Sequence, residues 1–154
     1  MGLSSFPLVA SLPVPVGRTA VASESPVVAA LGRCRPLFRQ SVLVVVAPGH
    51  ERWDALRFAR AEGACVTALC SPEQADDARA AGAAVVLDPE RTDPTWYRGW
   101  SVIVDPERTL GFRKARRSLR PGGAYVTGQA GPSDRALAAL GRLAGGPRLL
   151  DLRG

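Results

Sequence analysis

The chain has 154 residues and a formal net charge of +6 at pH 7. This length suits a single domain with a substantial buried core. Its arginines are scattered among acidic residues and form no basic stripe interleaved with aromatic residues, so we expect no nucleic-acid partner. No apolar run approaches the ~20 residues that span a bilayer, and the N-terminus lacks the features of a signal peptide. We therefore expect a cytoplasmic protein without membrane contact.

Residues 1–40 differ in composition from the rest of the chain. They contain five prolines, which interrupt any long helix, although the segment 27–33 can form about two helical turns. We predict a lead-in segment with a short helix that packs on a domain formed by residues 41–154.

From residue 41 onward, strand and helix patterns alternate. The predicted strands are 42–46, 65–69, 84–87, 102–104, 125–127 and 148–152, and the predicted helices are 53–62, 72–81, 109–119 and 133–143. Nearly continuous runs of Val, Leu and Ile between helices are typical of a parallel sheet covered on both faces. The pattern predicts one α/β domain with a doubly wound, Rossmann-like sheet of order 3-2-1-4-5-6, in which the segment 42–46 is central and buried.

One five-residue motif occurs twice, each time at the end of a predicted strand. The sequence Asp-Pro-Glu-Arg-Thr occurs at 88–92 and again at 105–109, each time after an apolar strand. Asp and Thr are capping residues and Pro favours a first turn, so we predict the same capping at both places. Gly122 and Gly123 follow a proline, which predicts a helix-to-strand turn before the fifth strand.

Six segments together resemble a known family. They are residues 10–14, 40–44, 59–68, 80–88, 102–105 and 119–128, and they follow one another without large gaps. In this order they resemble the cofactor domain of medium-chain dehydrogenases/reductases, most closely the quinone oxidoreductase and polyketide enoylreductase branch. The resemblance implies an NADPH-dependent oxidoreductase. It also implies an N-terminal catalytic domain of the GroES-like barrel type, which this sequence does not contain, so a partner protein would have to supply the substrate site.

The turn after the first strand departs from the family. The resemblance implies Ala-x-Gly-Gly-Val-Gly, where the glycines allow close approach of a pyrophosphate, whereas residues 47–52 read Ala-Pro-Gly-His-Glu-Arg. Only Ala47 and Gly49 keep their roles. Arg52 falls on the helix stripe that should face the sheet, so either the helix is displaced or the guanidinium turns toward the crevice. Glu51 places an acid at the helix end that would otherwise attract phosphate.

The remaining cofactor positions follow the second and fourth strands. Ser71 resembles the NADPH-preferring branch, yet residues 72–77 contain no basic side chain for a 2′-phosphate. Residues 106–108 are bulkier than the small residues that the family places after Asp105. We expect NADPH binding to be weak or absent, with the candidate cofactor-binding residues Ala47, Gly49, His50, Arg52, Ser71 and Asp105.

The sequence contains few residues that could act as catalytic groups or metal ligands. His50 is the only histidine, and its ordinary pKa is near neutrality. With Asp54 and Asp105 it could serve acid/base chemistry, but no nucleophile can be placed beside it, and a solvated loop histidine is the simpler interpretation. The three cysteines lack the paired spacing of zinc ligands, so we predict no metal site and assign no catalytic residue.

Three functions stay open at this point. The first is an oxidoreductase-family protein with weakened dinucleotide binding. The second is a cofactor-free binding or assembly module that reuses the sheet, favoured if a large apolar surface is uncovered. The third is a non-redox enzyme that uses the crevice at the strand ends. The substrate does not follow from the sequence.

The resemblance also implies a homodimer that pairs the terminal edge strands, here residues 148–152. Proline at Leu150 is expected to remove a backbone donor from that edge and release monomers.

Overall fold

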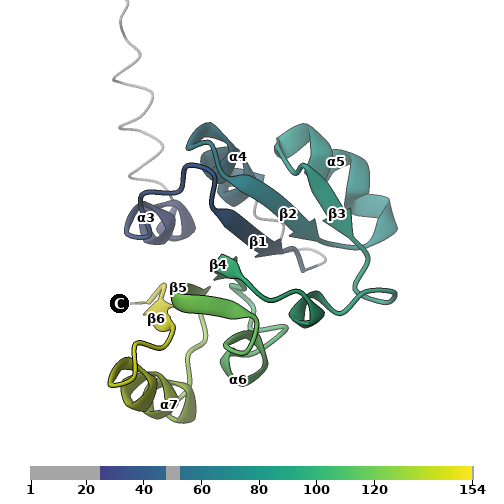
Figure 1. Cartoon of the computed structure of the whole chain (residues 1–154). Coiled ribbons are helices and arrows are strands. Elements are labelled where there is room, and N and C mark those ends of the chain that lie inside the picture. The colour runs from purple at the N-terminus through teal and green to yellow at the C-terminus, as the bar shows by residue number, and fades with distance from the viewer. Residues whose placement is uncertain (1–24, 48–52, 154) are drawn as a thin grey trace, which may run out of the picture.

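The computed structural model describes residues 25–47 and 53–153. Within them, one six-stranded parallel sheet has the order β3-β2-β1-β4-β5-β6 (Figure 1). The strands are β1 (Ser41–Val45), β2 (Cys65–Leu69), β3 (Val85–Leu87), β4 (Trp100–Val104), β5 (Leu119–Thr127) and β6 (Arg148–Asp151). The predicted α/β fold and strand order are confirmed.

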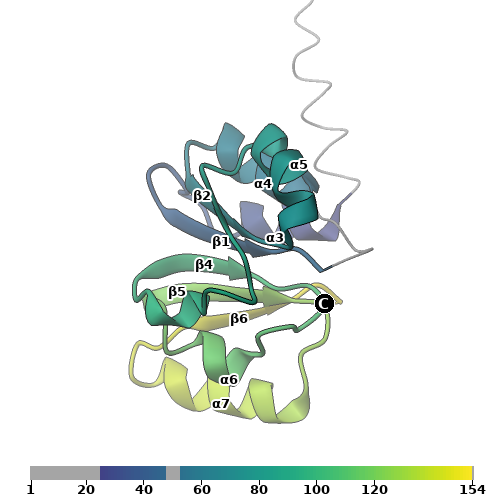
Figure 2. The ribbon, with the colours of Figure 1, turned by 90° about the vertical axis from the view of Figure 1, so that its right-hand side faces the viewer.

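Helices cover the two faces of the sheet unequally. The helices on one side are α3 (Pro26–Gly32), α4 (Trp53–Ala61) and α5 (Ala75–Ala81), and those on the other are α6 (Phe112–Ala115) and α7 (Pro132–Arg142) (Figure 2). Each crossover contains an α-helix except the one from β3 to β4, which holds only the 3-10 helix η3 (Pro94–Trp96). The second face therefore has helices over β4–β6 but none over β1–β3.

The central strand β1 is buried on both faces, as predicted. Val42 and Val44 belong to the hydrophobic cluster under α3 and α4, whereas Leu43 and Val45 belong to the cluster on the opposite face. All four are at most 4% exposed. Alternate side chains of a strand point to opposite faces. A strand made of branched apolar residues therefore contributes buried side chains to both clusters.

The predicted stripe of α4 also faces the sheet. Ala55, Leu56 and Ala59 are fully buried, which matches their spacing of three and four residues. Arg52, which the sequence places on the same stripe, lies outside the described residues.

Helix α6 is much shorter than the predicted helix 109–119. The reason is Asp105, whose carboxylate accepts hydrogen bonds from the backbone N–H groups of Thr109, Leu110 and Gly111. These bonds hold residues 109–111 in a loop, and Gly111 has a φ of +80°, which a helix cannot contain. The helix can begin only at Phe112.

Strand β5 begins earlier than predicted, at Leu119. Trp100 pairs with Leu119 and Val102 pairs with Ala124, so four residues on β5, 120–123, lie opposite Ser101 of β4 and form a bulge. The predicted helix-to-strand turn at Gly122 and Gly123 is therefore wrong: these glycines lie inside the strand. A Cβ on Gly123 would lie 2.9 Å from the carbonyl oxygen of Arg120, so the bulge requires glycine there.

The described part of the lead-in segment is well packed. Four residues of α3 are buried, namely Val27, Val28, Ala30 and Leu31. The Ser25 hydroxyl accepts a hydrogen bond from the N–H of Val28, which caps the helix, and donates one to Asp54 of α4. The boundary at residue 40 stays a prediction. Among the described residues, no helix is long and apolar enough to cross a membrane.

We expect Leu56→Ala to destabilise the fold by about 2–5 kcal/mol, because it opens a cavity between α4 and the sheet. Leu140→Ala is the matched control, since Leu140 lies on α7 with 68% of its surface exposed; its effect should stay within about 0.5 kcal/mol. Urea unfolding measures both. Equal losses would contradict the described packing.

Candidate functional site

In a doubly wound sheet, ligands bind beyond the carboxyl ends of the strands, near the point where the strand order reverses. Here that point lies between β1 and β4. Three candidate residues follow neighbouring strands at this edge: Ala47 after β1, Ser71 after β2 and Asp105 after β4. The other three, Gly49, His50 and Arg52, lie outside the described residues, and their roles stay predictions.

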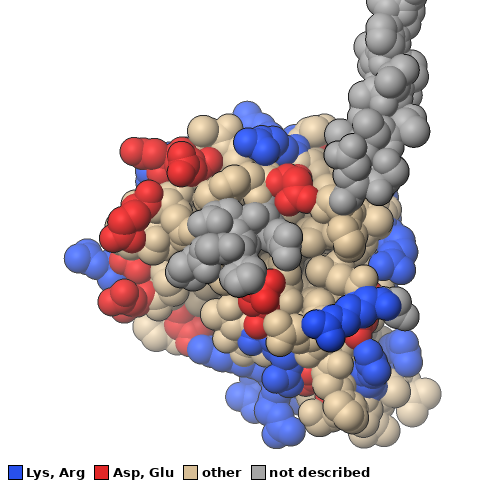
Figure 3. All heavy atoms as spheres, turned by 180° about the vertical axis from the view of Figure 1, so that it is seen from behind, with Lys and Arg blue, Asp and Glu red and all other residues tan. Residues whose placement is uncertain are grey.

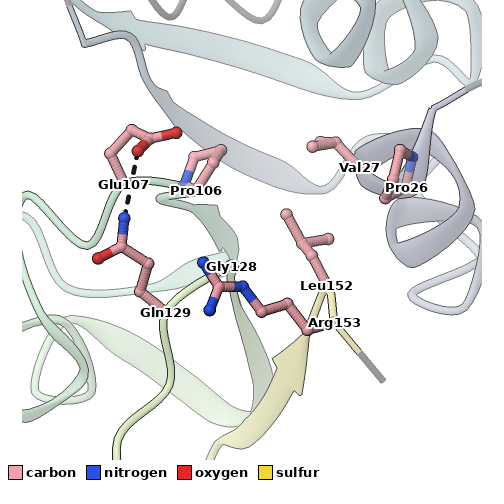
Figure 4. Close-up of a pocket in the computed structure, with 8 residues that line it drawn as sticks. All are labelled: Pro26, Val27, Pro106, Glu107, Gly128, Gln129, Leu152 and Arg153. Atoms are coloured by element: carbon pink, nitrogen blue, oxygen red, sulfur yellow. Dashed lines mark hydrogen bonds between the residues drawn. The ribbon is translucent and has the colours of Figure 1, made fainter.

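A small hollow opens at this edge on the β4–β6 side. Its volume is about 280 Å³, and its lining consists of Pro26, Val27, Pro106, Glu107, Gly128, Gln129, Leu152 and Arg153 (Figure 4). We call it the strand-end hollow. Of the candidate cofactor residues that the structure describes, Ala47, Ser71 and Asp105, none lines it. Two lining segments, 128–129 and 152–153, follow β5 and β6, whose ends parallel topology brings to the same edge as that of β4.

Internal hydrogen bonds tie the walls of the strand-end hollow together. The amide of Gln129 donates to the carboxylate of Glu107 at 3.2 Å, and the N–H of Gly128 donates to the carbonyl of Pro106 at 3.0 Å. Figure 4 shows the Arg153 side chain reaching over the hollow toward Gly128. Arg153 forms no ion pair with any described residue. Among the described residues that line the hollow, Arg153 is the only cation. Its backbone N–H, through a hydrogen bond, and its charge help to lower the pKa of Asp151.

An ion pair fixes the bulky segment after Asp105. The Arg108 guanidinium binds the Asp134 carboxylate through Nε at 2.9 Å and Nη2 at 2.8 Å. The same carboxylate accepts the N–H of Gly131 and caps the start of α7. Asp134 is almost fully buried. Breaking the ion pair of a buried charge costs several kcal/mol, because it leaves that charge without a partner. The segment 106–108 is therefore held in place by α7.

Asp105 itself serves the fold. It is fully buried, and its carboxylate accepts three backbone N–H groups at 2.7–3.2 Å and the Tyr125 hydroxyl at 2.7 Å. Burial raises the pKa of Tyr125, and the neighbouring Asp105 carboxylate raises it further, so the phenol keeps its proton and donates. The predicted helix capping is wrong at both places: Asp105 binds N–H groups of the loop before α6, whose N-cap is Gly111, and the Asp88 carboxylate accepts the N–H of Glu90 in a turn.

The other acid/base candidate is also engaged within the fold. One carboxylate oxygen of Asp54 accepts the Ser25 hydroxyl and the other accepts the N–H of Ala55. With Asp105 in its loop and His50 outside the described residues, the geometry brings together no acid/base pair at the strand ends.

The region after β2 is acidic. Ser71 binds the side chain of Gln74 at 3.2 Å, and the residues that follow include Glu73, Asp76 and Asp77. The next basic residue in the sequence, Arg79, pairs with Asp76. In Figure 3, acidic side chains gather on the left, over the part of the molecule that contains α5 and β3. The region after β2 fits the 2′-phosphate of NADPH poorly, because the negative electrostatic potential of its acidic side chains repels anions.

The site predicted from the sequence lies at this edge of the sheet and stays a prediction, and it did not include Gln129, Leu152, Arg153 or the α3 residues that line the strand-end hollow. Residues just past the fifth and sixth strands could have been found from the predicted topology alone. The place of α3 beside them depends on packing and has no local signal. Among the described residues, no group of three or more His, Cys, Asp and Glu side chains could hold a metal ion.

No protein-family model and no curated protein sequence matches the chain. Solved structures do match. The quinone oxidoreductase from Coxiella burnetii aligns with 82% of the chain and 40% of its own length, with a TM-score of 0.65 and 16% identity. A thermostable alcohol dehydrogenase from Pyrobaculum aerophilum aligns with 82% of the chain and 38% of its own, with a TM-score of 0.62 and 25% identity.

The yhdH oxidoreductase from Salmonella enterica, solved in complex with NADP, aligns with 82% of the chain and 42% of its own length, with a TM-score of 0.60 and 17% identity. The chain thus spans about two fifths of the length of these oxidoreductases. The resemblance to quinone oxidoreductases and alcohol dehydrogenases, expected from the sequence, is confirmed. At these identities it establishes the fold.

We expect Tyr125→Phe to cost about 1.5–3 kcal/mol at neutral pH, because it removes a buried hydrogen bond to a carboxylate. The raised pKa of Tyr125 means that the folded state holds this proton after the unfolded state has lost it. The wild type should therefore lose stability as the pH rises above about 10, by up to about 1.4 kcal/mol per pH unit, relative to the variant. Urea unfolding between neutral pH and pH 11 measures this difference. Parallel profiles would contradict the assigned role.

Proposed function

We propose that the chain is a cofactor domain of the medium-chain dehydrogenase/reductase superfamily, like those of quinone oxidoreductases and enoylreductases, in which NADPH binding is weakened or lost. The fold, the strand order and the quoted sequence segments support the family. The observation that carries the weakened binding is the strand-end hollow. Its volume of about 280 Å³ lies below the usual range of ligand pockets, and Glu107 and Gln129 bond across it.

Both ends of a dinucleotide would meet obstacles. On the β4–β6 side, the segment 106–108 is locked to α7 by Arg108 and Asp134. Beyond β2, acidic side chains replace the cation that a 2′-phosphate needs. Between them, Glu51 and Arg52 stand where the family has small residues. The described residues therefore fit the cofactor poorly, and we derive no reaction step through it.

For redox activity we propose a partner protein that supplies a catalytic domain. The support is indirect: Asp54 and Asp105, the carboxylates nearest the crevice in the sequence prediction, are committed to internal hydrogen bonds. A hydride transfer between a cofactor and a substrate would need proton donors from elsewhere.

Calorimetric titration with NADPH and with NADH tests the proposal. We expect dissociation constants weaker than about 100 μM. Submicromolar binding of either nucleotide by the unmodified chain would overturn the proposed weakening.

The double variant Glu51→Val with Arg52→Gly restores residue types that the family has at these positions, and we expect it to tighten NADPH binding at least about tenfold. The matched control is Glu62→Val with Arg35→Ala, which also removes one acid and one base but changes a pair between the segment after α4 and the segment before β1, at the opposite end of the strands. An equal gain in both would show that the effect is not local to the turn after β1.

We also propose that two copies of the chain pair through β6. This strand pairs with β5 on one side only, which leaves its other edge open within the described residues. The N–H of Leu152 donates to Thr127 of β5, and the alternation of backbone directions gives Leu150 the same orientation. The expectation for proline at Leu150 is therefore wrong, because it would break the ladder inside the subunit. The donors at the open edge belong to Leu149 and Asp151.

We expect Leu149→Pro to release monomers, because it removes an edge donor, whereas Leu149→Ala keeps that donor and should leave the dimer intact. Light scattering at tens of micromolar protein compares the two. A wild type that is monomeric at this concentration would refute the dimer. If both variants are equally dimeric, the interface does not involve β6.

A further inference from the structure

The face of β1–β3 opposite α4 and α5 lacks the cover that parallel sheets normally have. The crossover from β3 to β4, which would carry a helix over it, contains only η3. A parallel sheet is stable when both faces are shielded from water, so an uncovered stretch of it is unusual. Val85 of β3 is accordingly 49% exposed.

A pocket of about 540 Å³ occupies this place. We call it the β1–β3 pocket. Strand residues that share one face form its floor, and residues of the β3–β4 connection together with Trp100, the first residue of β4, form its wall. The floor contains Ser41, Cys65, Thr67, Val85 and Leu87, and the wall contains Thr92, Asp93, Pro94, Trp96, Tyr97 and Trp100. It lies far from the strand-end hollow in the fold, because Ser41 and Cys65 begin their strands.

Three aromatic rings dominate the wall. Trp100 is buried and fixed, since its indole N–H donates to the carbonyl of Pro94 at 3.0 Å. The Tyr97 ring packs against Trp100, with ring centroids 4.6 Å apart. Trp96, in contrast, is 78% exposed and Tyr97 is 51% exposed. Rings left in water beside an apolar floor gain free energy when a flat apolar ligand covers them.

The floor carries two hydroxyl groups that open to the pocket. Thr67 is 8% exposed, and its hydroxyl, like that of Ser41, is not one of the buried side-chain atoms left without a hydrogen-bond partner among the described residues, so both hydroxyls can meet solvent or a ligand in the pocket. Ser41 pairs with Cys65, two positions before Thr67, so both hydroxyls lie on neighbouring strands of the same face. A recessed hydroxyl that opens to a pocket is a favourable partner for a polar group of a bound molecule.

The charge of the pocket is already balanced. Among the described lining residues the only charged one is Asp93, whose carboxylate accepts the N–H and hydroxyl of Thr95 and pairs with Lys114 at 3.1 Å. A charged ligand would lose hydration without meeting a free counter-charge. The pocket therefore favours uncharged molecules.

We propose that the β1–β3 pocket is a binding site for an uncharged, flat, mostly apolar small molecule that carries one hydroxyl or carbonyl group. The ring system lies against Trp96 and Tyr97, and the polar group meets Thr67 or Ser41. The volume falls within the range of small-molecule pockets, and the mixture of an apolar lining with few polar groups is typical of them. This site is independent of dinucleotide binding at the strand ends.

Nile red, which is uncharged and fluoresces in apolar surroundings, is the probe. We expect it to bind at one site per chain with a dissociation constant in the low micromolar range, and we expect naphthalene and 2-naphthol to displace it. Trp96→Ala and Val85→Glu should each weaken Nile red binding at least about tenfold. Both residues are exposed, so the variants should keep the wild-type melting temperature.

Leu143→Ala is the control, because Leu143 is a large exposed apolar residue of the chain segment after α7, 88% exposed; it should leave Nile red binding unchanged. Thr67→Val should weaken the binding of 2-naphthol about three- to tenfold and leave the binding of naphthalene unaffected. The substitution removes the hydroxyl group and nearly preserves the shape of the side chain. No binding of Nile red at about 100 μM protein would overturn the proposal in favour of a protein segment as occupant. Undiminished binding in Trp96→Ala and Val85→Glu would overturn it as well.

Discussion

The side chains of β1 divide the interior of the molecule into two clusters. Val42 and Val44 pack beneath α3 and α4, while Leu43 and Val45 point to the other side, and all are buried. A parallel strand in this position has no side that tolerates water, so both faces have to be filled. On the second face α6 and α7 lie over β4–β6, and Phe112 of α6 shares a hydrophobic cluster with Leu43 and Val45 of β1. The aromatic wall of the β3–β4 connection shields the rest in part, and the β1–β3 pocket is the space that it leaves.

The strand-end loops illustrate a second constraint, which bears on function. In a site prepared for a ligand, backbone donors and charged groups await partners from outside. Here Asp105 collects four donors, Arg108 pairs with Asp134, and Glu107 bonds to Gln129. A nucleotide would have to replace these bonds with its own. The loops are therefore stabilised by the chain itself, which is the physical basis of the proposed weak cofactor binding.

The global features of this fold were accessible from sequence because they depend on repeated patterns. Runs of branched apolar residues, the spacing of Ala55, Leu56 and Ala59, and the alternation of strands with helices each gave a correct element. The errors have single-residue causes. The Asp105 carboxylate shortened the helix predicted at 109–119, and the bulge at Gly123 lengthened β5.

The candidate sites were less predictable than the fold. The edge of the sheet followed from topology, but the lining of the strand-end hollow depends on where α3 packs. The β1–β3 pocket depends on a missing helix, and the sequence showed this only in that no helix is predicted between the third and fourth predicted strands. The three-dimensional structure is needed to tell which polar side chains open to a pocket, as the Thr67 hydroxyl does, because this depends on every neighbouring residue.

The strand order has a consequence for how the chain reaches this structure. Val42 pairs with Val102 sixty positions along, whereas Ser41 and Cys65, or Thr67 and Val85, pair across far shorter intervals. Closing a longer loop costs more conformational entropy, and distant pairings form more slowly. We expect β1–β3 and β4–β6 to assemble as separate early units, each with its own helices, and the ladder between β1 and β4 to join them last. The centre of the finished sheet is then the final part of it to form.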